Sequence, residues 1–321
     1  MAYDKLTNLV YAIGNTDKGG YWVDKASTLT GFNTQASQVG IILQTTDGSE
    51  QVGGGVAYDE NVQYPIQVVA EPTGKYIFVT SIASSNPQLV KSIPTGSFPN
   101  VLGSNVRPYG DEFFVVVERY VVDVIDSTTT SGVDLTVTQD WHSTFKVNGG
   151  ESAFVEGMTL AGNGDTLIIV GSTPGSGAAF GQNIGTDMDG FLMRIDPETG
   201  DLFPNQISQK RLDSSNEQDD WITAICNDRF DNDSFYVVGA TKGYIRELPA
   251  AGQPPEGTIH SFIAKISADS LNPEWIKHFT MTTAPGAGVA KASAYACTVT
   301  TEGESNLVYM AGVVELSLIH I

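Results

Sequence analysis

Short apolar runs separated by polar turns recur along the whole chain, and one of these runs ends each time in a small residue. Between Tyr295 and Val314 two such runs are joined by a Gly-containing polar turn. Counterparts of the second run are anchored on Gly14, Ser81, Gly171, Gly239 and Gly312, which lie 67, 90, 68 and 73 residues apart. Three of these separations agree closely, and a loop insertion accounts for the longest. The period predicts one structural unit used about five times.

Each complete repeat adds a third and a fourth apolar run to this pair. The third runs are GYWVDK (20–25), DEFFVVVERY (111–120), DGFLMRID (189–196) and HSFIAKIS (260–267). The fourth runs are WHSTF from Trp141, WIKHF from Trp275, NQISQKRL (205–212) and, in the first repeat, VGIILQ (39–44). Short β-rich runs bounded by turn residues predict strands, so each repeat is expected to form a four-stranded antiparallel meander.

Such a sheet has two faces to cover and cannot cover either one alone. Successive copies are therefore expected to stack face to face around an axis, which gives a β-propeller. Complete blades are predicted at about residues 65–147, 154–212 and 221–281, with partial blades at 1–46 and 293–314. The predicted fold is all-β: one β-propeller fragment over residues 1–315, an incomplete ring with about four and a half blades.

Both ends of the sequence read as cut. The start, MAYDKLTNLVYAIG, aligns with the middle of the repeat and lacks the basic and apolar regions of a signal peptide. At the other end, residues 316–321 (LSLIHI) match no repeat position and resemble translated adaptor sequence. We therefore take this tail as non-native and expect the parent protein to extend beyond both ends.

The charge balance narrows the choice of partners. The chain has 37 acidic and 17 basic residues, a formal charge of −20, and this charge repels phosphate backbones and anionic lipids. Nucleic acid is therefore not expected as a partner. The sequence also has no apolar run near the ~18 residues that span a bilayer, so no membrane segment is predicted in it. Its 34 Gly and 14 Pro fit a turn-rich β protein.

The two cysteines, Cys226 and Cys297, are too few for a disulfide framework. They occupy nearly equivalent places on the first apolar runs of successive repeats. Equivalent positions point the same way and need not face each other, so we expect two small buried hydrophobic side chains. A bridge between them is the alternative.

The order of motifs in the later repeats resembles a known repeat family. DGFLMRIDPETGDL, then NEQDDWITAICND, then SFYVVGAT are similar to a β-propeller family whose members read roughly DAFVAKLDPSG, then Trp, then GDDYGYAIAVDSDGNVYVTGYT. SFIAKISADSLNPEW and ASAYACTVTTEGESNLVYMAGV repeat the likeness, which covers most of residues 65–314. The resemblance implies a ring of about seven blades. It implies no catalytic or ligand residues, because the recurring positions are structural.

The recurring large and acidic residues have a physical explanation. Trp141 with Phe145, and Trp275 with Phe279, fall on one face of a period-two strand and are expected to fill the space between blades. Short acidic side chains before strands bond turn amides. That role is predicted for Asp111, Asp189, Asp219 and Asp220.

One acidic turn is a candidate metal site. In TDMDGF, Asp187 and Asp189 alternate before a Gly, as in short calcium loops. The third acid and the closing Glu of such loops are absent, and Asp189 also holds a structural position of the family. A structural role is the favoured interpretation, and calcium binding by Asp187 and Asp189 is the alternative. A second acidic turn, 228–235, is expected to be a hairpin turn with Asp231 and Asp233 solvated. No other cofactor is predicted.

The sequence contains no recognisable catalytic constellation. It does contain long connections between the second and third runs of each repeat, at residues 83–110, 173–188 and 241–259. Long loops on a rigid scaffold commonly carry binding groups. We expect a non-enzymatic binding or scaffold module of an extracellular or cell-surface protein, which presents these loops to a protein or a glycan. A hydrolase or lyase with a carboxylate pair on the same loop face is the first alternative, and a purely structural spacer is the second.

Overall fold

The computed structural model describes the strands and several of the turns that join them. The described residues are 2–4, 9–16, 38–45, 51–53, 63–84, 113–126, 133–145, 154–174, 188–203, 209–212, 218–228, 230–245, 258–279, 291–302 and 305–315. Within these residues the regular structure is β-strand, apart from one 3-10 turn at Gly162–Gly164. The all-β prediction is therefore confirmed. No described segment is a helix long and apolar enough to cross a membrane.

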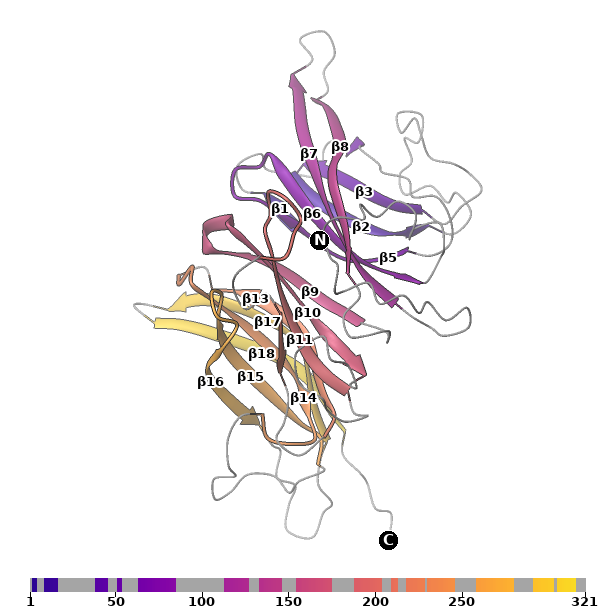
Figure 1. The fold of residues 1–321 in the computed structure, drawn as a ribbon. Helices are drawn as coiled ribbons and strands as arrows, with labels where there is room; N and C mark the ends of the chain where they lie inside the picture. Colours follow the sequence, from indigo (N-terminus) through magenta and orange to yellow (C-terminus); the bar gives the residue numbers. More distant parts are fainter. Residues whose placement is uncertain are drawn as a thin grey trace. The chain divides into compact units, whose positions relative to one another are not determined.

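In the described part of the chain the strands form five antiparallel sheets, and strands consecutive in sequence are neighbours in each sheet (Figure 1). Sheet I contains β1 (Ala2–Asp4), β2 (Leu9–Thr16), β3 (Gln38–Thr45) and β4 (Gln51–Gly53). Sheet II contains β5 (Gln63–Ala70), β6 (Tyr76–Ser84), β7 (Phe113–Asp126) and β8 (Val133–Phe145). Sheet III contains β9 (Phe154–Ala161), β10 (Thr166–Pro174), β11 (Met188–Ile195) and β12 (Gln209–Leu212). Sheet IV contains β13 (Asp220–Asn227), β14 (Ser234–Thr241), β15 (His260–Ser267) and β16 (Pro273–Phe279), and β17 (Lys291–Glu302) with β18 (Ser305–Glu315) forms a two-stranded hairpin.

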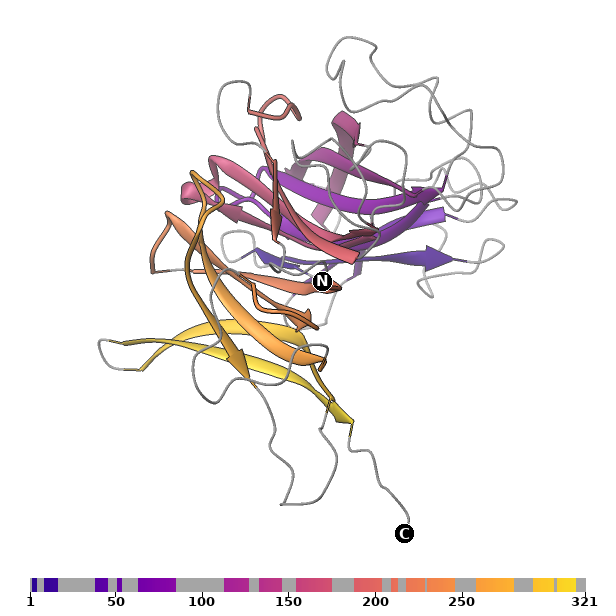
Figure 2. The ribbon, with the colours of Figure 1, turned by 60° about the horizontal axis from the view of Figure 1, so that its bottom comes forward.

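The sheets belong to two compact units. The first unit comprises Met1–Lys146 and Pro197–Asp201 and contains sheets I and II. The second comprises Val147–Asp196 and Leu202–Ile321 and contains sheets III and IV and the β17–β18 hairpin. Within the second unit, sheet IV lies between sheet III and the hairpin (Figure 2).

The predicted strand quartets reproduce sheets II, III and IV. Sheet I differs from the prediction. Its run VGIILQ lies in β3 and pairs with β2, so it is the third strand and not the fourth. Two strands of three residues, β1 and β4, complete the sheet at its edges. The run GYWVDK, predicted as the third strand, lies outside the described residues. The error arose because this run matched the aromatic start of the other third strands.

A β-bulge explains the small residue that recurs at the end of each second strand. In sheets II, III, IV and the hairpin, the first strand carries one unpaired residue opposite this position, namely Ile66, Glu156, Thr223 and Tyr295. The bulge pushes a carbonyl oxygen toward the second strand. A Cβ on Gly171 would lie 2.0 Å from the Phe154 oxygen, and one on Gly239 would lie 1.9 Å from the Trp221 oxygen. Glycine is therefore required at these two positions.

The largest described core lies between sheets III and IV. Sheet III contributes five buried side chains, which are Ala161, Ile168, Val170, Leu192 and Leu212. Sheet IV and the turns next to it contribute ten. The members from sheet IV are Ile222, Ile225, Phe235, Val237, Ile245, Phe262, Ala264, Ile266, Ala268 and Leu271. These side chains alternate along their strands with those of the opposite face. The opposite face of sheet IV packs on the hairpin through Tyr236, Val238, Ile263 and Ala294. Sheet IV is thus apolar on both faces, as the repeat pattern predicts.

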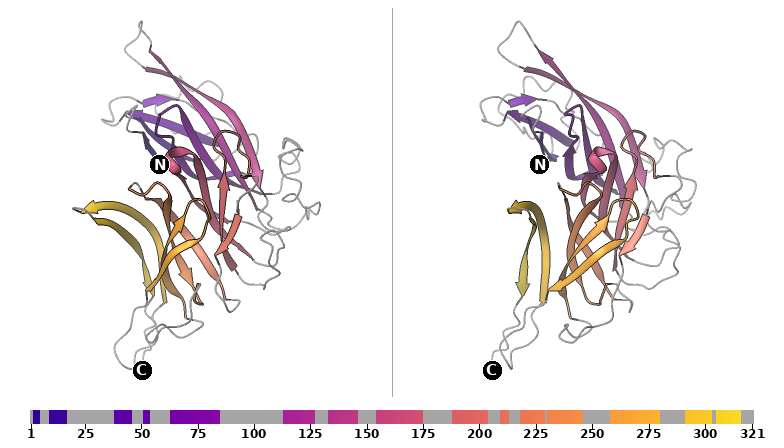
Figure 3. Two further views of the ribbon diagram at one scale, coloured as in Figure 1. Left: turned by 60° about the vertical axis from the view of Figure 1, so that its left-hand side comes forward. Right: turned by 90° about the vertical axis from the view of Figure 1, so that its left-hand side faces the viewer.

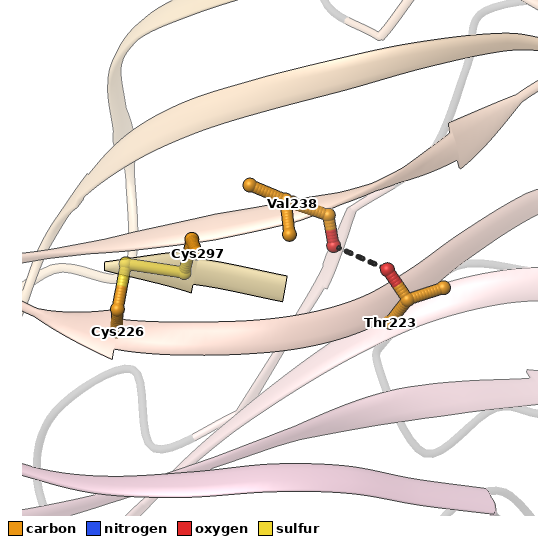
Figure 4. Close-up of a disulfide and its surroundings, with 4 residues drawn as sticks. All are labelled: Thr223, Cys226, Val238 and Cys297. Atoms are coloured by element: carbon orange, nitrogen blue, oxygen red, sulfur yellow. Dashed lines mark hydrogen bonds between the residues drawn. A yellow bond between two sulfur atoms is a disulfide. The ribbon is translucent and has the colours of Figure 1, made fainter. Parts of the chain in front are cut away.

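The two cysteines form a disulfide between β13 and β17 (Figure 4), with their Cα atoms 5.8 Å apart. The expectation of two separate thiols is wrong. Its error lay in assuming that equivalent strands keep their side chains apart. The first strands of sheet IV and the hairpin pack against each other, so Cys226 and Cys297 meet. Thr223 reinforces the same junction, since its hydroxyl lies 2.5 Å from the Ala294 oxygen and 3.1 Å from the Val238 oxygen.

A cation recurs at one register position of the third strands. In each third strand, one residue pairs with the recurring small residue of the second strand, and the cation follows it by three positions. The cation is Arg119 in sheet II, Arg194 in sheet III and Lys265 in sheet IV. In the first unit, Arg119 donates to the Pro197 carbonyl at 2.8 Å and to Asp140 at 2.7 Å. In the second unit, Arg194 bonds the backbone carbonyl of Asp269, in the turn between β15 and β16. These cations therefore anchor turns between third and fourth strands.

Lys265 has a different set of partners. It contacts Asp231 at 2.5 Å and Glu274 at 3.4 Å, both at the turn end of sheet IV. The predicted hairpin turn lies between β13 and β14, and its Asp231 is partly exposed as expected but also pairs with Lys265, which the sequence did not predict. Hydrogen bonding to Lys265, against partial burial, lowers the pKa of Asp231.

The two predicted Trp–Phe pairs have different environments. In the first unit Phe145 is fully buried, and the Trp141 indole N–H donates to the Pro197 carbonyl at 3.2 Å. In the second unit Trp275 is 36% exposed and Phe279 is 46% exposed. Trp275 contacts the Tyr236 ring at 5.9 Å between centroids. Packing of the first pair between blades stays a prediction, whereas the exposure of Trp275 and Phe279 shows that the second pair does not fill such a space.

Replacing both cysteines by serine should lower the free energy of unfolding of the second unit by about 4 kcal/mol, since the bridge closes a loop of 71 residues. Urea denaturation of Cys226→Ser/Cys297→Ser, compared with the oxidised parent, measures the loss. The intact mass of the untreated chain should rise by about 2 Da on reduction, which is the mass of the two thiol hydrogens. An unchanged mass would show that the bridge does not form in solution.

Candidate functional site

The predicted loops connect strand ends that lie at one end of each sheet. Most of residues 83–110, 173–188 and 241–259 lie outside the described residues, but their flanking strands are described. In sheet III, Pro174 at the end of β10 pairs with Met188 at the start of β11. In sheet IV, Thr241 at the end of β14 pairs with both Asp220 and His260. We call this end of sheets III and IV the loop-bearing end. It is marked by Pro174 and Met188 in sheet III and by Asp220, Thr241 and His260 in sheet IV.

Asp219 joins the two sheets at the loop-bearing end. Its carboxylate accepts a hydrogen bond from the backbone N–H of Met188 at 3.0 Å and forms an ion pair with Lys242. The backbone N–H of Lys242 also donates to the Asp219 carbonyl at 2.9 Å. The Lys242 ammonium lies 5.5 Å from the centre of the Trp221 ring, within range of a cation–π interaction. Asp219 was predicted to bond a turn amide; it bonds a backbone amide instead in the neighbouring strand β11.

The ionised form of Asp219 is favoured by these contacts. Partial burial of the carboxyl group acts in the opposite direction, but the hydrogen bonds from Lys242 and from the Met188 amide lower its pKa. Asp219 is therefore a fixed anion at neutral pH. Its lone pairs are used to hold the start of β13 against the start of β11, which is a structural task.

Two histidines and a tyrosine form an aromatic cluster at the same end of sheet IV. His260 on β15 is 1% exposed, and its Nε2 lies 3.1 Å from Nδ1 of His278 on β16. The other ring nitrogen, Nδ1, lies 2.9 Å from the Thr258 carbonyl oxygen. A carbonyl can only accept, so Nδ1 of His260 carries the proton and Nε2 accepts from His278. The Tyr244 ring lies beside both, with centroids 5.8 and 6.0 Å away.

Both imidazoles are held in the neutral form. Burial and the neighbouring His260 together lower the pKa of His278 to about 4, against a backbone hydrogen bond at Ile245. Burial also lowers the pKa of His260, against the hydrogen bond to Thr258. A proton added to either ring would place a charge in this buried cluster, and a proton on Nε2 of His260 would also remove the acceptor of the bond between the two rings. The pair therefore ties the start of β15 to the end of β16 at neutral pH.

Of the two predicted calcium ligands, only Asp189 is among the described residues. Asp187 lies outside the described residues, as does Asp111. Asp189 lies in β11, is 1% exposed, and pairs with Thr173. Among the described residues, no three His, Cys, Asp or Glu side chains come close enough together to hold a metal ion. Calcium binding by Asp187 and Asp189 stays a prediction.

Among the acidic side chains that the structure describes, Glu156 has the pKa that is raised furthest toward neutrality. It is the unpaired bulge residue of β9, and its side chain reaches solvent. The surrounding protein nevertheless excludes enough water to raise its pKa to about 7. A carboxyl group that is partly protonated at neutral pH can donate or accept a proton.

Sequence reasoning missed the histidine cluster. His260 and His278 are 18 positions apart in the sequence, and no local motif joins them. The register of the β15–β16 hairpin was the signal that could have joined them, since Phe262 pairs with His278 and places it diagonally from His260.

No family model and no curated protein matches this sequence.

Acidification should destabilise the second unit through the two histidines. Their pKa values are lower in the folded state than in the unfolded chain, so the stability that they contribute is present above about pH 6.5 and is lost as the pH falls toward 4. His278→Phe should remove up to about 2 kcal/mol of this pH dependence, allowing for solvent screening. Urea melts at pH 7 and pH 5 measure it, with His142→Phe on β8 as the matched control. Equal pH dependence in parent and His278→Phe would contradict the assignment.

Proposed function

We propose that the sheets are blades of a β-propeller and that the chain is a non-enzymatic binding or scaffold module. Four-stranded meanders that pack face to face through apolar surfaces support the first part. The second part rests on one observation. The best-defined polar groups at the loop-bearing end are used in bonds to one another, through Asp219 with Lys242 and His260 with His278.

This arrangement suits a rigid frame for loops. The bonds fix the end of β14 and the starts of β11 and β15, which the second-to-third-strand connections join, and they also fix the start of β13. A frame that is already ordered lowers the entropy cost of binding through the loops it carries. We infer that residues 173–188 and 241–259 contact a protein or a glycan.

The setting proposed for this module is extracellular or at a cell surface. The disulfide between Cys226 and Cys297 supports an oxidising compartment, because such bridges are rare where thiols are kept reduced. The net charge of −20 favours neutral or basic partners over nucleic acid.

Replacing loop residues 246–257 by a Gly-Ser linker of equal length should abolish binding and leave the fold intact. The full chain is first applied to glycan and protein arrays, where we expect saturable binding. The variant should then bind at least about tenfold more weakly to the partner found. The matched control replaces residues 127–132, which connect β7 to β8 at the opposite end of a sheet. Equal binding by parent, loop variant and control would contradict the proposal, as would the absence of any array signal.

A hydrolase or lyase is the second candidate function, and the raised pKa of Glu156 supports it. In that case a broad glycosidase and lyase screen should detect turnover that declines above about pH 7, where the general acid loses its proton. Glu156→Gln should lower the rate by about 100-fold or more, whereas Glu71→Gln, on an exposed turn of the first unit, should not. Turnover that persists in Glu156→Gln would exclude this carboxyl as the proton donor.

A further inference from the structure

The second strand of the hairpin corresponds to a strand that is buried in sheet IV. Aligned on Gly239 and Gly312, β18 is the counterpart of β14. Every residue of β14 is buried, and β14 pairs with β13 on one side and β15 on the other. Among the described residues, β18 pairs only with β17. Its Tyr309 is 54% exposed and its Val313 is 59% exposed, and the hairpin is the last layer of the second unit in Figure 3.

The third strand supplies an aromatic ring to the glycine of the second strand in sheets III and IV. Gly171 pairs with Phe191, and Gly239 pairs with Phe262. In both cases the ring covers the glycine, since a Cβ there would lie 2.7 or 2.8 Å from the ring edge. The nearest atoms around Gly312 all belong to β17. The surface of β18 over Gly312 therefore lacks the aromatic ring that covers Gly171 and Gly239, and a ring from a third strand would cover it.

The next specific position lies three residues further along. In sheet IV, Lys265 follows Phe262 by three residues and pairs with Tyr236. In sheet III, Arg194 follows Phe191 in the same way. The counterpart of Tyr236 on β18 is Tyr309, whose exposed ring can receive a cation. Any strand that continues the pattern on β18 would thus carry Phe-x-x-Lys or Phe-x-x-Arg.

We propose that the free edge of β18 is a strand-addition site for a basic, extended segment with the pattern Phe-x-x-Lys/Arg. The segment pairs antiparallel with β18, places its Phe over Gly312, and places its cation against Tyr309. Main-chain hydrogen bonds provide affinity, and these two side chains provide the register.

Two further features support this occupant. The chain carries a formal charge of −20, so a cationic segment is attracted and an acidic one is repelled. The hairpin is also held in place before binding, because Cys297 on β17 is bonded to Cys226 and Ala294 is buried against sheet IV. An edge that is already ordered pays little entropy when a strand is added.

The probe is a dye-labelled peptide with the sequence of residues 258–268, TIHSFIAKISA, which carries this pattern and has one Lys and no acidic residue. Fluorescence anisotropy with the full chain should show saturable binding. Replacing the peptide Phe by Ala should weaken binding at least about tenfold, because the ring loses its seat. Tyr309→Ala in the protein should weaken it about threefold to tenfold, whereas Tyr295→Ala, equally exposed but on β17, should not.

Two peptides methylated on alternate backbone amides test the main-chain pairing without altering the protein. One set of N–H groups faces β18 and the other faces solvent, so one peptide should bind at least about tenfold more weakly than the other. A benzophenone at the Phe position should crosslink to residues 305–315. Equal binding of the two methylated peptides would overturn the proposal. Crosslinks elsewhere would do so too, as would self-association through β18 that the peptide does not inhibit.

Discussion

The apolar contact between sheets III and IV is the interaction on which the second unit depends. Fifteen buried side chains meet there, and each large one contributes about 1.5–3 kcal/mol when it leaves water. By comparison, partly exposed ion pairs such as Lys265 with Glu274 contribute about 1 kcal/mol or less. The polar ties described above therefore do not hold the sheets together. They fix which strand ends and which turns meet once the apolar faces are in contact.

The recurring small residue and the recurring cation are local consequences of this stacking. A bulge in each first strand forces Gly171 and Gly239 to lack a side chain, and a Phe of the third strand then fills the space above the glycine. Because the third strand is thereby fixed in register, the cation three residues later reaches a constant place. Arg194 donates to the Asp269 carbonyl in the turn between β15 and β16, whereas Lys265 pairs with acidic residues of its own sheet such as Asp231.

The sequence alone predicted the features that depend on the repeat period and on the alternation of apolar and polar residues. The strand quartets of sheets II to IV follow from apolar runs bounded by turns, and the Trp141–Phe145 pair follows from their spacing. Contacts that depend on register between sheets could not be read in this way. The Cys226–Cys297 bridge needs the first strands of two sheets to touch, and the His260–His278 bond needs the pairing of β15 with β16. The exposure of Trp275 was not predicted, although the two runs that form the hairpin beside sheet IV were.

The two proposed interaction surfaces differ in what binding would change. At the loop-bearing end, Asp219 and His260 already have partners, so a ligand that displaced Lys242 or His278 would leave a buried polar group unpaired, at a cost of about 1–3 kcal/mol. Binding there must use the loops and leave the frame intact. At the edge of β18 the reverse holds, because backbone groups exchange water for a strand and Tyr309 becomes covered. The first surface thus favours many ligands through loop sequence, and the second favours one backbone conformation with one side-chain pattern.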